Sequence, residues 1–364
     1  MRLVHLADYE AAYSGSFVPM LREALGSAQQ RGWSATAVFP EAARGRDWAR
    51  ALDGEFEVLF LPPSRAGVAG LIRRGSRTIL HTNFTAYDLA TALAARGDPE
   101  THVVWQAQSN LVATLPGNLR AFIKYTGARR LVDAVVCVAP HIAREVLRHG
   151  APPRRTLYLP NAIDTGRFRP PAPEARDEAR KLLGLPANRP VVLHYGWAWH
   201  RKGGDLFCAA IGELRRRGVE VTPATVGAGA AAAADARRYG IEDELVVLPA
   251  MQDVTRLLAA ADVLALPSRA EGMPFAVLES LASGVPVVAG DIPGQTVDTD
   301  LAAYRTARLE PGALADAIEA QLGASEEARA AARAHVEAQR SLTVWAERIH
   351  AVYDAILAGR GLPT

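Results

Sequence analysis

The sequence has few cysteines and no long apolar run. Its two cysteines among 364 residues, Cys137 in "AVVCVAP" and Cys208 in "GDLFCAAIG", stand in apolar surroundings. We therefore expect buried free thiols in a reducing compartment and no disulfide framework. No apolar run approaches the roughly 20 residues that a membrane-spanning helix needs. The N-terminal "MRLVHLADYE" also lacks the apolar core of a signal peptide, so we expect a cytoplasmic protein.

The chain has little net charge, but its charges are unevenly distributed. The formal net charge is +2, and residues 1–170 carry 21 basic and 14 acidic groups, which leaves 20 and 25 in the remainder. The excess lies largely in "SRAGVAGLIRRGSR" and "RAFIKYTGARR", which contain Arg73, Arg74, Arg77, Lys124, Arg129 and Arg130. Two interpretations stay open: a solvated face, or a surface for an anionic acceptor or the inner face of a membrane. We expect no nucleic-acid partner.

Short apolar runs alternate with amphipathic stretches along the whole chain. They are "RLVHLA", "SATAVF", "EVLFL", "RTILH", "HVVWQA" and "AVVCVA", then "PVVLHYG", "VEVTPATVG", "LVVLP", "DVLALP" and "VPVVAG". Near-continuous apolar strands separated by helices are typical of parallel sheets covered on both faces. The chain is also longer than the roughly 250 residues at which single cores stop growing. We therefore predict two doubly wound, Rossmann-like α/β domains that face each other across a central cleft.

The domain boundary is predicted in the proline-rich segment "PNAIDTGRFRPPAPEAR", because proline favours an extended, poorly helical connection. We place the first domain at residues 1–168 and the second at residues 169–342. Residues 343–364 contain a helical pattern with a wide apolar stripe, which would allow this terminal helix to pack on either domain, including a crossing back to the first.

The segment "SRAEGMPFAVLESLASGVPVVAGDIPG", residues 268–294, places Glu271 and Glu279 eight positions apart. It follows the strand-like "ADVLALP" and so begins with a strand-to-helix loop, where open parallel sheets bind their ligands. Pro274 suits the first turn of the next helix, and Gly284 suits its C-terminal end. Three backbone N–H groups would then face a ligand near a positive helix end: those of Gly272, Met273 and Phe275.

Such a helix end attracts phosphate, and each glutamate can accept two hydroxyl hydrogens in a fork. Glu271, just before the helix, would reach a neutral polyol beside the phosphate. Glu279, about one turn into the helix, would accept hydrogen bonds from a ribose diol. This arrangement suits a sugar nucleotide, although a pair of acids at this separation would mean little by itself.

The whole string is more specific and resembles a known family. The part "EGMPFAVLE" is similar to the Glu-x7-Glu signature of retaining glycosyltransferases of family 4, and "SLASGVPVVAGDIPG" to the segment that follows it there. Further similar segments are "YLPNAIDTGRFRP" between the domains, "GWAWHRKGGDLF" at the phosphate-binding strand-loop-helix, and "SGSF" at the first loop. The matches extend from about residue 15 to residue 295.

The resemblance implies a GT-B fold and a metal-independent enzyme that needs no cofactor, with nucleotide sugar on the C-terminal domain and a hydroxyl acceptor on the N-terminal one. It implies transfer with retention, in which the leaving phosphate takes the proton of the acceptor. Lys202 occupies the family's lysine position for the diphosphate, and Gly196 closes the strand before it. The loop of Gly15 and Ser16 would cover the diphosphate from the other domain. A UDP-sugar is the favoured donor, since it is the commonest among such relatives.

Two departures from the family pattern are visible. The family usually has an arginine after the glycine of the phosphate-binding strand, whereas this chain has Trp197 after Gly196. Either Arg201 replaces that cation, or Trp197 and Trp199 line the sugar pocket.

Relatives also carry a histidine near the end of the strand "HVVWQAQS", where this chain offers Gln106 and Gln108. Glutamine donates and accepts hydrogen bonds but does not ionise, so it would position the donor and transfer no proton. His81 in "ILHTNFTAYD" is the remaining imidazole candidate on the acceptor or sugar side, with a structural histidine as the alternative.

Other functions were weighed against this one. "VGAGAAA", residues 226–232, imitates a dinucleotide fingerprint, but no acid closes the next strand, so a nicotinamide oxidoreductase is disfavoured. Asp298 and Asp300 in "DTD" imitate a metal site, yet they follow the donor helix and are better interpreted as a surface turn. A nucleotide-sugar epimerase of the same fold and an inactive sugar-binding module also remain alternatives.

The expected role is bacterial polysaccharide or glycolipid assembly, or glycosylation of a secondary metabolite such as an antibiotic. The base, sugar, acceptor, linkage and oligomeric state are left open by the sequence.

Overall fold

The computed structural model describes residues 1–73, 75–109, 115–296, 298 and 300–363. Its chain divides into two compact units, one formed by Met1–Ala162 together with Leu342–Thr364 and the other by Ile163–Ser341.

In the first unit, the described residues form a seven-stranded parallel sheet in the order β3-β2-β1-β4-β5-β6-β7. The order reverses direction at β1, as in other doubly wound sheets. The strands are β1 (Arg2–Ala7), β2 (Ser34–Phe39), β3 (Glu57–Phe60), β4 (Thr78–Asn83), β5 (Thr101–Ala107), β6 (Ala134–Cys137) and β7 (Thr156–Tyr158).

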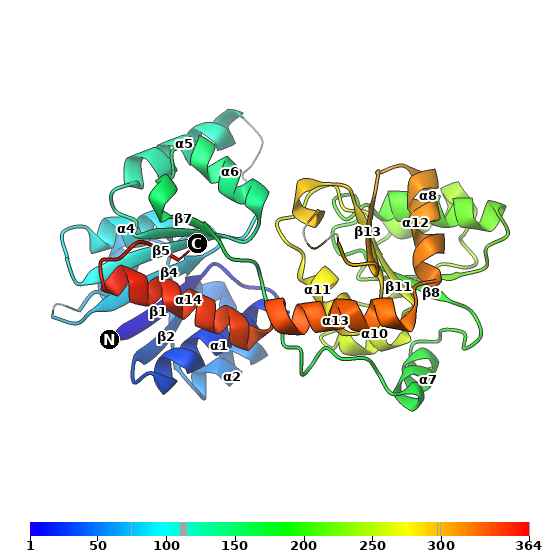
Figure 1. The fold of residues 1–364 in the computed structure, drawn as a ribbon, viewed down its shortest axis with the longest axis horizontal. Helices are drawn as coiled ribbons and strands as arrows, with labels where there is room; N and C mark the ends of the chain where they lie inside the picture. Colours follow the sequence, from blue (N-terminus) through cyan, green and yellow to red (C-terminus); the bar gives the residue numbers. More distant parts are fainter. Residues whose placement is uncertain (74, 110–114, 297, 299, 364) are drawn as a thin grey trace. The chain divides into compact units, whose positions relative to one another are not determined.

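Helices cover this sheet on both faces (Figure 1). They are α1 (Phe17–Gln30), α2 (Asp47–Asp53), α3 (Arg65–Ala69), α4 (Asp88–Ala95), α5 (Leu115–Ala128), α6 (Pro140–Arg148) and the C-terminal α14 (Leu342–Leu357). The helices α3 and α4 share a buried apolar cluster with β1, β2 and β4. The C-terminal helix α14 lies beside α1, and its buried stripe makes it part of the first unit.

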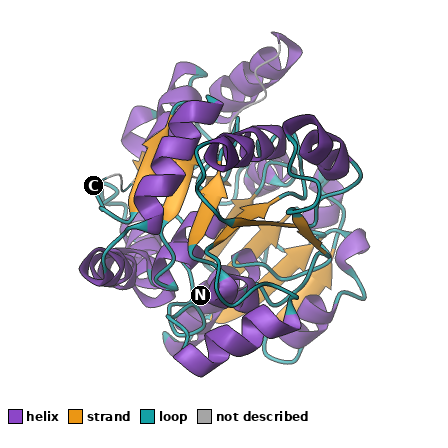
Figure 2. Cartoon of the chain, turned by 90° about the vertical axis from the view of Figure 1, so that its right-hand side faces the viewer, coloured by secondary structure: helices purple, strands orange, loops and turns teal. Residues whose placement is uncertain are grey.

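In the second unit, the described residues form a six-stranded parallel sheet in the order β10-β9-β8-β11-β12-β13. The strands are β8 (Val191–Tyr195), β9 (Thr222–Val226), β10 (Val246–Leu248), β11 (Val263–Leu266), β12 (Val287–Gly290) and β13 (Tyr304–Ala307). Figure 2 shows the strands of the chain in orange, with helices in purple around them.

The helices of this unit are α7 (Pro173–Leu182), α8 (Gly204–Arg216), α9 (Ala231–Tyr239), α10 (Thr255–Ala260), α11 (Phe275–Ala282), α12 (Pro311–Leu322) and α13 (Glu326–Arg340). The apolar faces of α8, α9 and α12 pack with β8, β11 and β12 in one core cluster. Cys208 is buried in that cluster and Cys137 is buried in β6, and both are free thiols as expected.

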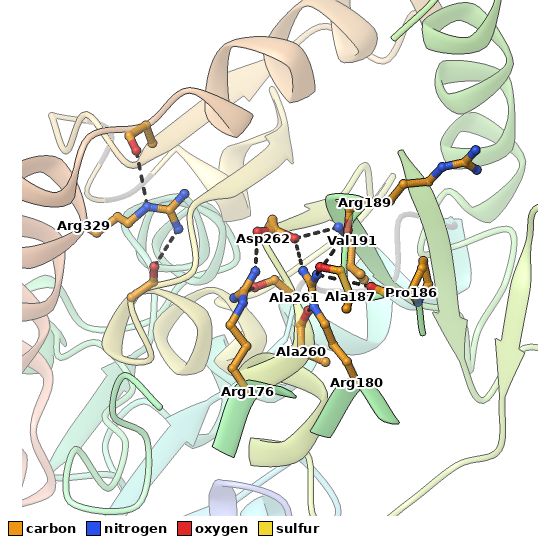
Figure 3. Close-up of polar contacts among 12 residues, drawn as sticks. Arg176, Arg180, Pro186, Ala187, Arg189, Val191, Ala260, Ala261, Asp262 and Arg329 are labelled. Atoms are coloured by element: carbon orange, nitrogen blue, oxygen red, sulfur yellow. Dashed lines mark hydrogen bonds and ion pairs between the residues drawn. The ribbon is translucent and has the colours of Figure 1, made fainter. Parts of the chain in front are cut away.

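A carboxylate at the start of β11 joins α7 to the sheet (Figure 3). Asp262 forms ion pairs with Arg176 at 2.5 Å and with Arg180 at 2.6 Å, and it accepts a hydrogen bond from the Val191 backbone N–H at 2.6 Å. The buried Arg180 also donates to four backbone carbonyls, among them those of Ala260 and Ala187. The beginnings of β8 and β11 are therefore fixed together below the site that lies at their other ends.

The doubly wound α/β architecture predicted for each half is confirmed. Two edge strands were not predicted. β7 has only three residues, which follow a Pro and Arg-rich turn, and β13 reads "YRTA", with little apolar content. No helix among the described residues is both long and apolar enough to cross a membrane.

Candidate active site

The candidate site lies on two loops of the second unit. One loop follows β8 and leads through residues 196–203 into α8, and the other follows β11 and leads through residues 267–274 into α11. Because β8 and β11 are parallel neighbours, their carboxyl ends meet at the same edge of the sheet. Lys202 on the first loop and Glu271 on the second are thereby brought together.

Glycines allow these loops to approach each other closely. Gly203 precedes α8 with φ +72°, and a Cβ at this position would overlap the carbonyl oxygen of Pro267. On the other side, a Cβ at Gly294 would overlap the carbonyl oxygen of Glu271. Gly203 of "KGG" and Gly294 of "DIPG" are thus required because backbone lies against backbone on both sides of the glutamate loop.

Lys202 and Glu271 form a buried ion pair. Lys202 Nζ donates to Glu271 Oε1 at 2.6 Å, and each side chain is only 7% exposed. Burial lowers the pKa of Lys202, while the Glu271 carboxylate acts in the opposite direction. A pair of this kind has its two charges neutralised by each other in the absence of a ligand.

A second set of contacts joins the same loops. The Arg269 backbone N–H donates to the Arg201 carbonyl at 2.8 Å, and Arg201 Nη1 donates to the Ala270 carbonyl at 3.2 Å. The Arg269 guanidinium forms two hydrogen bonds of 2.7 Å to Asp205 on α8 and a third of 2.6 Å to the His200 carbonyl. Arg269 therefore holds the loop that carries Glu271 against the start of α8.

Sequence reasoning missed Arg269 and Asp205, because each by itself looks like an ordinary surface charge. It also missed His194, which lies fully buried in β8 beneath the site. His194 Nε2 lies 3.1 Å from the Lys202 carbonyl, and its Nδ1 lies 3.1 Å from Thr225 Oγ1. A carbonyl only accepts, so Nε2 carries the proton and Nδ1 accepts from the hydroxyl. Burial lowers the pKa of His194 to about 4, which keeps the ring neutral.

Helix α11 holds the second glutamate. Pro274 was expected in the first turn, but the structure places it one position earlier, at the N-cap, with extended φ and ψ of −72° and 124°. Gly284 follows the helix with φ +72°, as expected for its C-terminal end. Glu279 is buried within α11, which is unusual for a charged residue. Burial, together with the charge of Glu279, raises the pKa of Tyr195 at the end of β8.

The other predicted donor residues lie around these loops. Gly272 and Phe275 are partly exposed and Met273 is buried. Gly196 follows β8, where a Cβ would come within 2.7 Å of Thr225 Oγ1 on the neighbouring strand.

The two tryptophans of the β8 loop differ in their surroundings. Trp197 is 64% exposed. Trp199 is partly buried; its Nε1 donates to Asp235 at 2.7 Å, and a Cβ at Gly204 would overlap its ring. Trp199 is thus engaged in packing between the loop and α8.

In the first unit, Gly15 has φ +53° and Ser16 is the N-cap residue of α1. The Tyr9 hydroxyl donates to the Ser14 carbonyl at 3.1 Å, which closes the loop before them. The assignment of Gly15 and Ser16 to the donor stays a prediction.

The amide and imidazole candidates of this unit lie on β4 and β5 or just beyond β5, and His81 contacts Tyr353 of α14. His81 is fully buried, and its Nδ1 lies 2.5 Å from the Tyr353 hydroxyl. Burial lowers the pKa of His81 to about 3. Gln106 is buried on β5, and Gln108, just beyond that strand, donates to Asn83 Oδ1 at 3.3 Å. Their part in acceptor or sugar binding stays a prediction.

The acids of the "DTD" sequence are not brought into a cluster. Asp298, with φ +61°, accepts two hydrogen bonds of 2.8 and 3.0 Å from Arg340 Nη2 and lies 3.1 Å from His335 Nε2. No group of three His, Cys, Asp or Glu residues within the described part of the chain has a geometry suited to a metal ion.

Two family models match this chain. A model of "Glycosyltransferase Family 4" matches residues 30–167, and a model of "Glycosyl transferases group 1" matches residues 189–323. The chain belongs to glycosyltransferase family 4. This family 4 chain is 30% identical to the D-inositol 3-phosphate glycosyltransferase of Geodermatophilus obscurus over 319 residues. The aligned region covers 82% of this chain and 66% of that protein.

A second relative of this family 4 chain is the GDP-mannose-dependent alpha-(1-6)-phosphatidylinositol monomannoside mannosyltransferase of Mycolicibacterium smegmatis. It is 34% identical over 181 residues, 45% of this chain and 47% of the relative. The chain thus spans about two thirds of the length of the first relative and under half of the second.

Among solved structures, Anabaena Alr3699/HepE in complex with UDP and glucose superposes with a TM-score of 0.83, at 18% identity, over 98% of this chain and 100% of that one. Together with the two parallel-sheet units, this likeness confirms the predicted GT-B fold. The oxidoreductase and epimerase alternatives are not favoured by these comparisons.

Proposed function

We propose that the chain transfers a sugar from a nucleoside diphosphate to an acceptor hydroxyl, with retention at the anomeric carbon. The observation that carries this proposal is the buried ion pair of Lys202 and Glu271 at the adjacent ends of β8 and β11. A cation and a carboxylate held 2.6 Å apart at the start of two helices suit a ligand that is anionic on one side and rich in hydroxyls on the other.

In this proposal Lys202 leaves Glu271 and contacts the diphosphate, whose charge the N-terminal ends of α8 and α11 also stabilise. Glu271 then accepts hydrogen bonds from the sugar, and Glu279 accepts hydrogen bonds from the ribose. UDP is the favoured nucleotide. The bond between C1 of the sugar and the diphosphate oxygen breaks, the acceptor oxygen bonds to C1 on the same face, and the acceptor proton passes to the leaving diphosphate.

The chain contributes positioning and charge to this step. Lys202 stabilises the negative charge of the leaving group, and Glu271 stabilises the positive character of the sugar ring. The reaction is proposed to need no metal, because a lysine and two helix ends neutralise the diphosphate. The Asp298 carboxylate, a candidate metal ligand, is hydrogen-bonded to Arg340 instead. EDTA should therefore leave the rate nearly unchanged, and complete inhibition that Mg²⁺ reverses would contradict this point.

The acceptor is proposed to be lipid-linked, because one helix of the first unit exposes an apolar stripe. Four large apolar side chains of α5, each between 51% and 88% exposed, occur at helical spacing: Leu115, Leu119, Phe122 and Ile123. An exposed apolar stripe marks an interaction surface. Directly after α5, Arg129 and Arg130 join Arg155 in lining a surface cavity of about 480 Å³. Apolar and cationic groups together suit an anionic membrane surface.

The structure narrows the set of basic residues that would meet such a surface. Lys124 is partly buried and forms an ion pair with the buried Asp88, and Arg77 pairs with Glu100 at 3.2 Å. Arg74 lies outside the described residues.

The relative from Mycolicibacterium smegmatis has phosphatidylinositol monomannoside in its name, and the Geodermatophilus obscurus relative has inositol 3-phosphate. Both acceptors are anionic.

Vesicle sedimentation tests the membrane contact. Binding to vesicles with anionic lipid is expected at low salt and should weaken at high ionic strength. Phe122→Glu should reduce it as much as Arg129→Glu does, whereas Arg44→Glu, on another surface of the same unit, should not. Absence of binding at low salt would leave a soluble acceptor.

The transfer itself is tested by a screen of nucleotide sugars for donor hydrolysis and thermal stabilisation, followed by NMR of the anomeric proton of the first product. Retention is expected. An inverted product would contradict the proposed mechanism, and a nucleotide that stabilises the protein without any turnover would favour the sugar-binding alternative.

A further inference from the structure

An exposed aromatic ring holds the two cations of the β8 loop. The Trp197 ring has Arg201 Cζ 4.8 Å and Lys202 Nζ 4.9 Å from its centroid, both within the range of a cation–π contact. Trp197 Cβ lies beside Gly227, 3.4 Å from where a Cβ on that glycine would be. The ring is therefore placed where two cations converge, although 64% of it faces solvent.

Both cations also converge on one carboxylate. Lys202 Nζ is 2.6 Å from Glu271 Oε1, and Arg201 Nη1 is 3.7 Å from Glu271 Oε2. Arg201 thus lies as a second cation beside this carboxylate, and Glu279 acts on Lys202 as a further negative charge. Lys202 is buried, whereas the Arg201 side chain is 42% exposed and lies nearer to solvent.

Arg201 keeps most of its hydrogen-bonding capacity. A guanidinium has five N–H donors, and the hydrogen bond it makes within the described residues is the one from Nη1 to the Ala270 carbonyl. An arginine can stack on an aromatic ring through the face of its guanidinium, and the donors in the plane then stay available to an anion. The Trp197 ring can therefore hold Arg201 in place both before and after an anion binds.

We infer that Arg201 is the second cation of the diphosphate site and that Trp197 is a positioning residue that holds it there. This inference rests on the proposed function. It assigns to Trp197 a role that differs from lining a sugar pocket, and Trp199 has no part in it because Trp199 is engaged with Asp235 and Gly204. A nucleoside diphosphate would use both cations, whereas a monophosphate would use one.

The test measures the affinities of UDP and UMP, and of GDP and GMP as a second pair, by calorimetry. Arg201→Ala should weaken diphosphate binding by about tenfold more than monophosphate binding, about 1.4 kcal/mol, since it removes a charge-assisted hydrogen bond that the diphosphate alone receives. Trp197→Ala should reproduce most of this selective loss. The double variant should be no weaker than Arg201→Ala alone, because Trp197 acts through Arg201.

Two variants exclude a general structural effect. Trp197→Phe keeps an aromatic face and should restore most of the diphosphate preference that Trp197→Ala loses. Arg238→Ala removes a similar arginine, whose Cζ lies 5.3 Å from the centroid of the Tyr239 ring on α9, and should leave both affinities unchanged.

The outcomes separate the inference from the function on which it rests. If the wild-type protein binds neither diphosphate, the proposed function and the inference both fail. If Lys202→Ala reduces the diphosphate preference and Trp197→Ala does not, the inference alone is wrong. Losses that add in the double variant would show that the two residues act independently, which also contradicts it.

Discussion

Replacing either member of the Lys202 and Glu271 pair should destabilise the second unit, and replacing both should restore much of the loss. Lys202→Met keeps the length of the side chain but leaves the Glu271 carboxylate buried, with Arg201 at 3.7 Å as the compensating charge that the described residues supply. Glu271→Gln is milder, because the amide oxygen can still accept from Lys202 Nζ. The double variant places a thioether beside an amide and leaves no buried charge at this position.

The size of the effect follows from the burial of both side chains, which are 7% exposed. Breaking a buried ion pair by removing one partner costs about 3–5 kcal/mol, whereas replacing the whole pair is often close to neutral. For a unit of this size, residues 163–341, each kcal/mol lowers Tm by about 2–4 °C. Lys202→Met should therefore lower the Tm of this unit by about 6–20 °C.

Denaturant unfolding of the four proteins at pH 7 gives the coupling free energy of the pair. The matched control is Arg308→Met, which breaks the exposed pair of Arg308 and Glu310 and should cost less than about 1 kcal/mol. A loss below about 1 kcal/mol for Lys202→Met would refute the reasoning, because the pair would then not be buried in solution. Losses that simply add in the double variant would refute it equally.

Three further predictions concern catalysis, loop approach and pH. Glu271→Gln should lower kcat far more than it weakens nucleotide binding, because the charge of Glu271 acts on a sugar that becomes cationic. Steady-state kinetics gives kcat and calorimetry gives the nucleotide affinity. A variant with the turnover of the wild type would remove Glu271 from the mechanism. Gly203→Ala should lower Tm more than Gly218→Ala does. Both glycines have positive φ, but of the two only Gly203 lies against the backbone of another loop. Equal losses of Tm would mean that backbone strain from the positive φ is the whole effect. Because burial lowers the pKa of His194 to about 4, below the value of about 6.5 in the unfolded chain, the unfolded state binds more protons between these values. Stability should therefore fall as the pH drops from 6.5 to 4, by about 3 kcal/mol from this residue. His194→Gln should flatten the fall, measured by urea unfolding at several pH values, and an unchanged slope would contradict the assignment.

The strands and the two site loops were predictable because their signals are local. Apolar runs bounded by glycine and proline show where β8 and β11 begin and end, and a loop after a parallel strand is where ligands bind. The proximity of Lys202 and Glu271 was not predictable from such runs, since it depends on β8 and β11 being neighbours. The resemblance to family 4 supplied that information.

The contacts that hold the two site loops together could not be predicted from the sequence. Arg269 meets Asp205 from 64 positions away, and nothing in either local sequence names the partner. His194 reads as one more residue of an apolar strand, and its role appears only once Lys202 lies above it with its carbonyl 3.1 Å away. The edge strand β13 was not predicted because its sequence is too polar to distinguish it from a loop.

The ligand-free pairing has a consequence for selectivity. Because Lys202 and Glu271 satisfy each other, a ligand must offer more than an anion: separating them exposes a buried carboxylate, which is costly unless it gains new hydrogen bonds. An isolated phosphate compensates Lys202 but gives Glu271 no hydrogen-bond donors, which leaves this carboxylate with Arg201 at 3.7 Å. A free sugar offers hydroxyls to Glu271 but no anion to Lys202. A complete nucleotide sugar compensates both in one binding event. The pair thus favours the intact donor over its fragments. Gly203 and Gly294 allow the β8 loop and the segment after β12 to lie directly against the loop that carries Glu271.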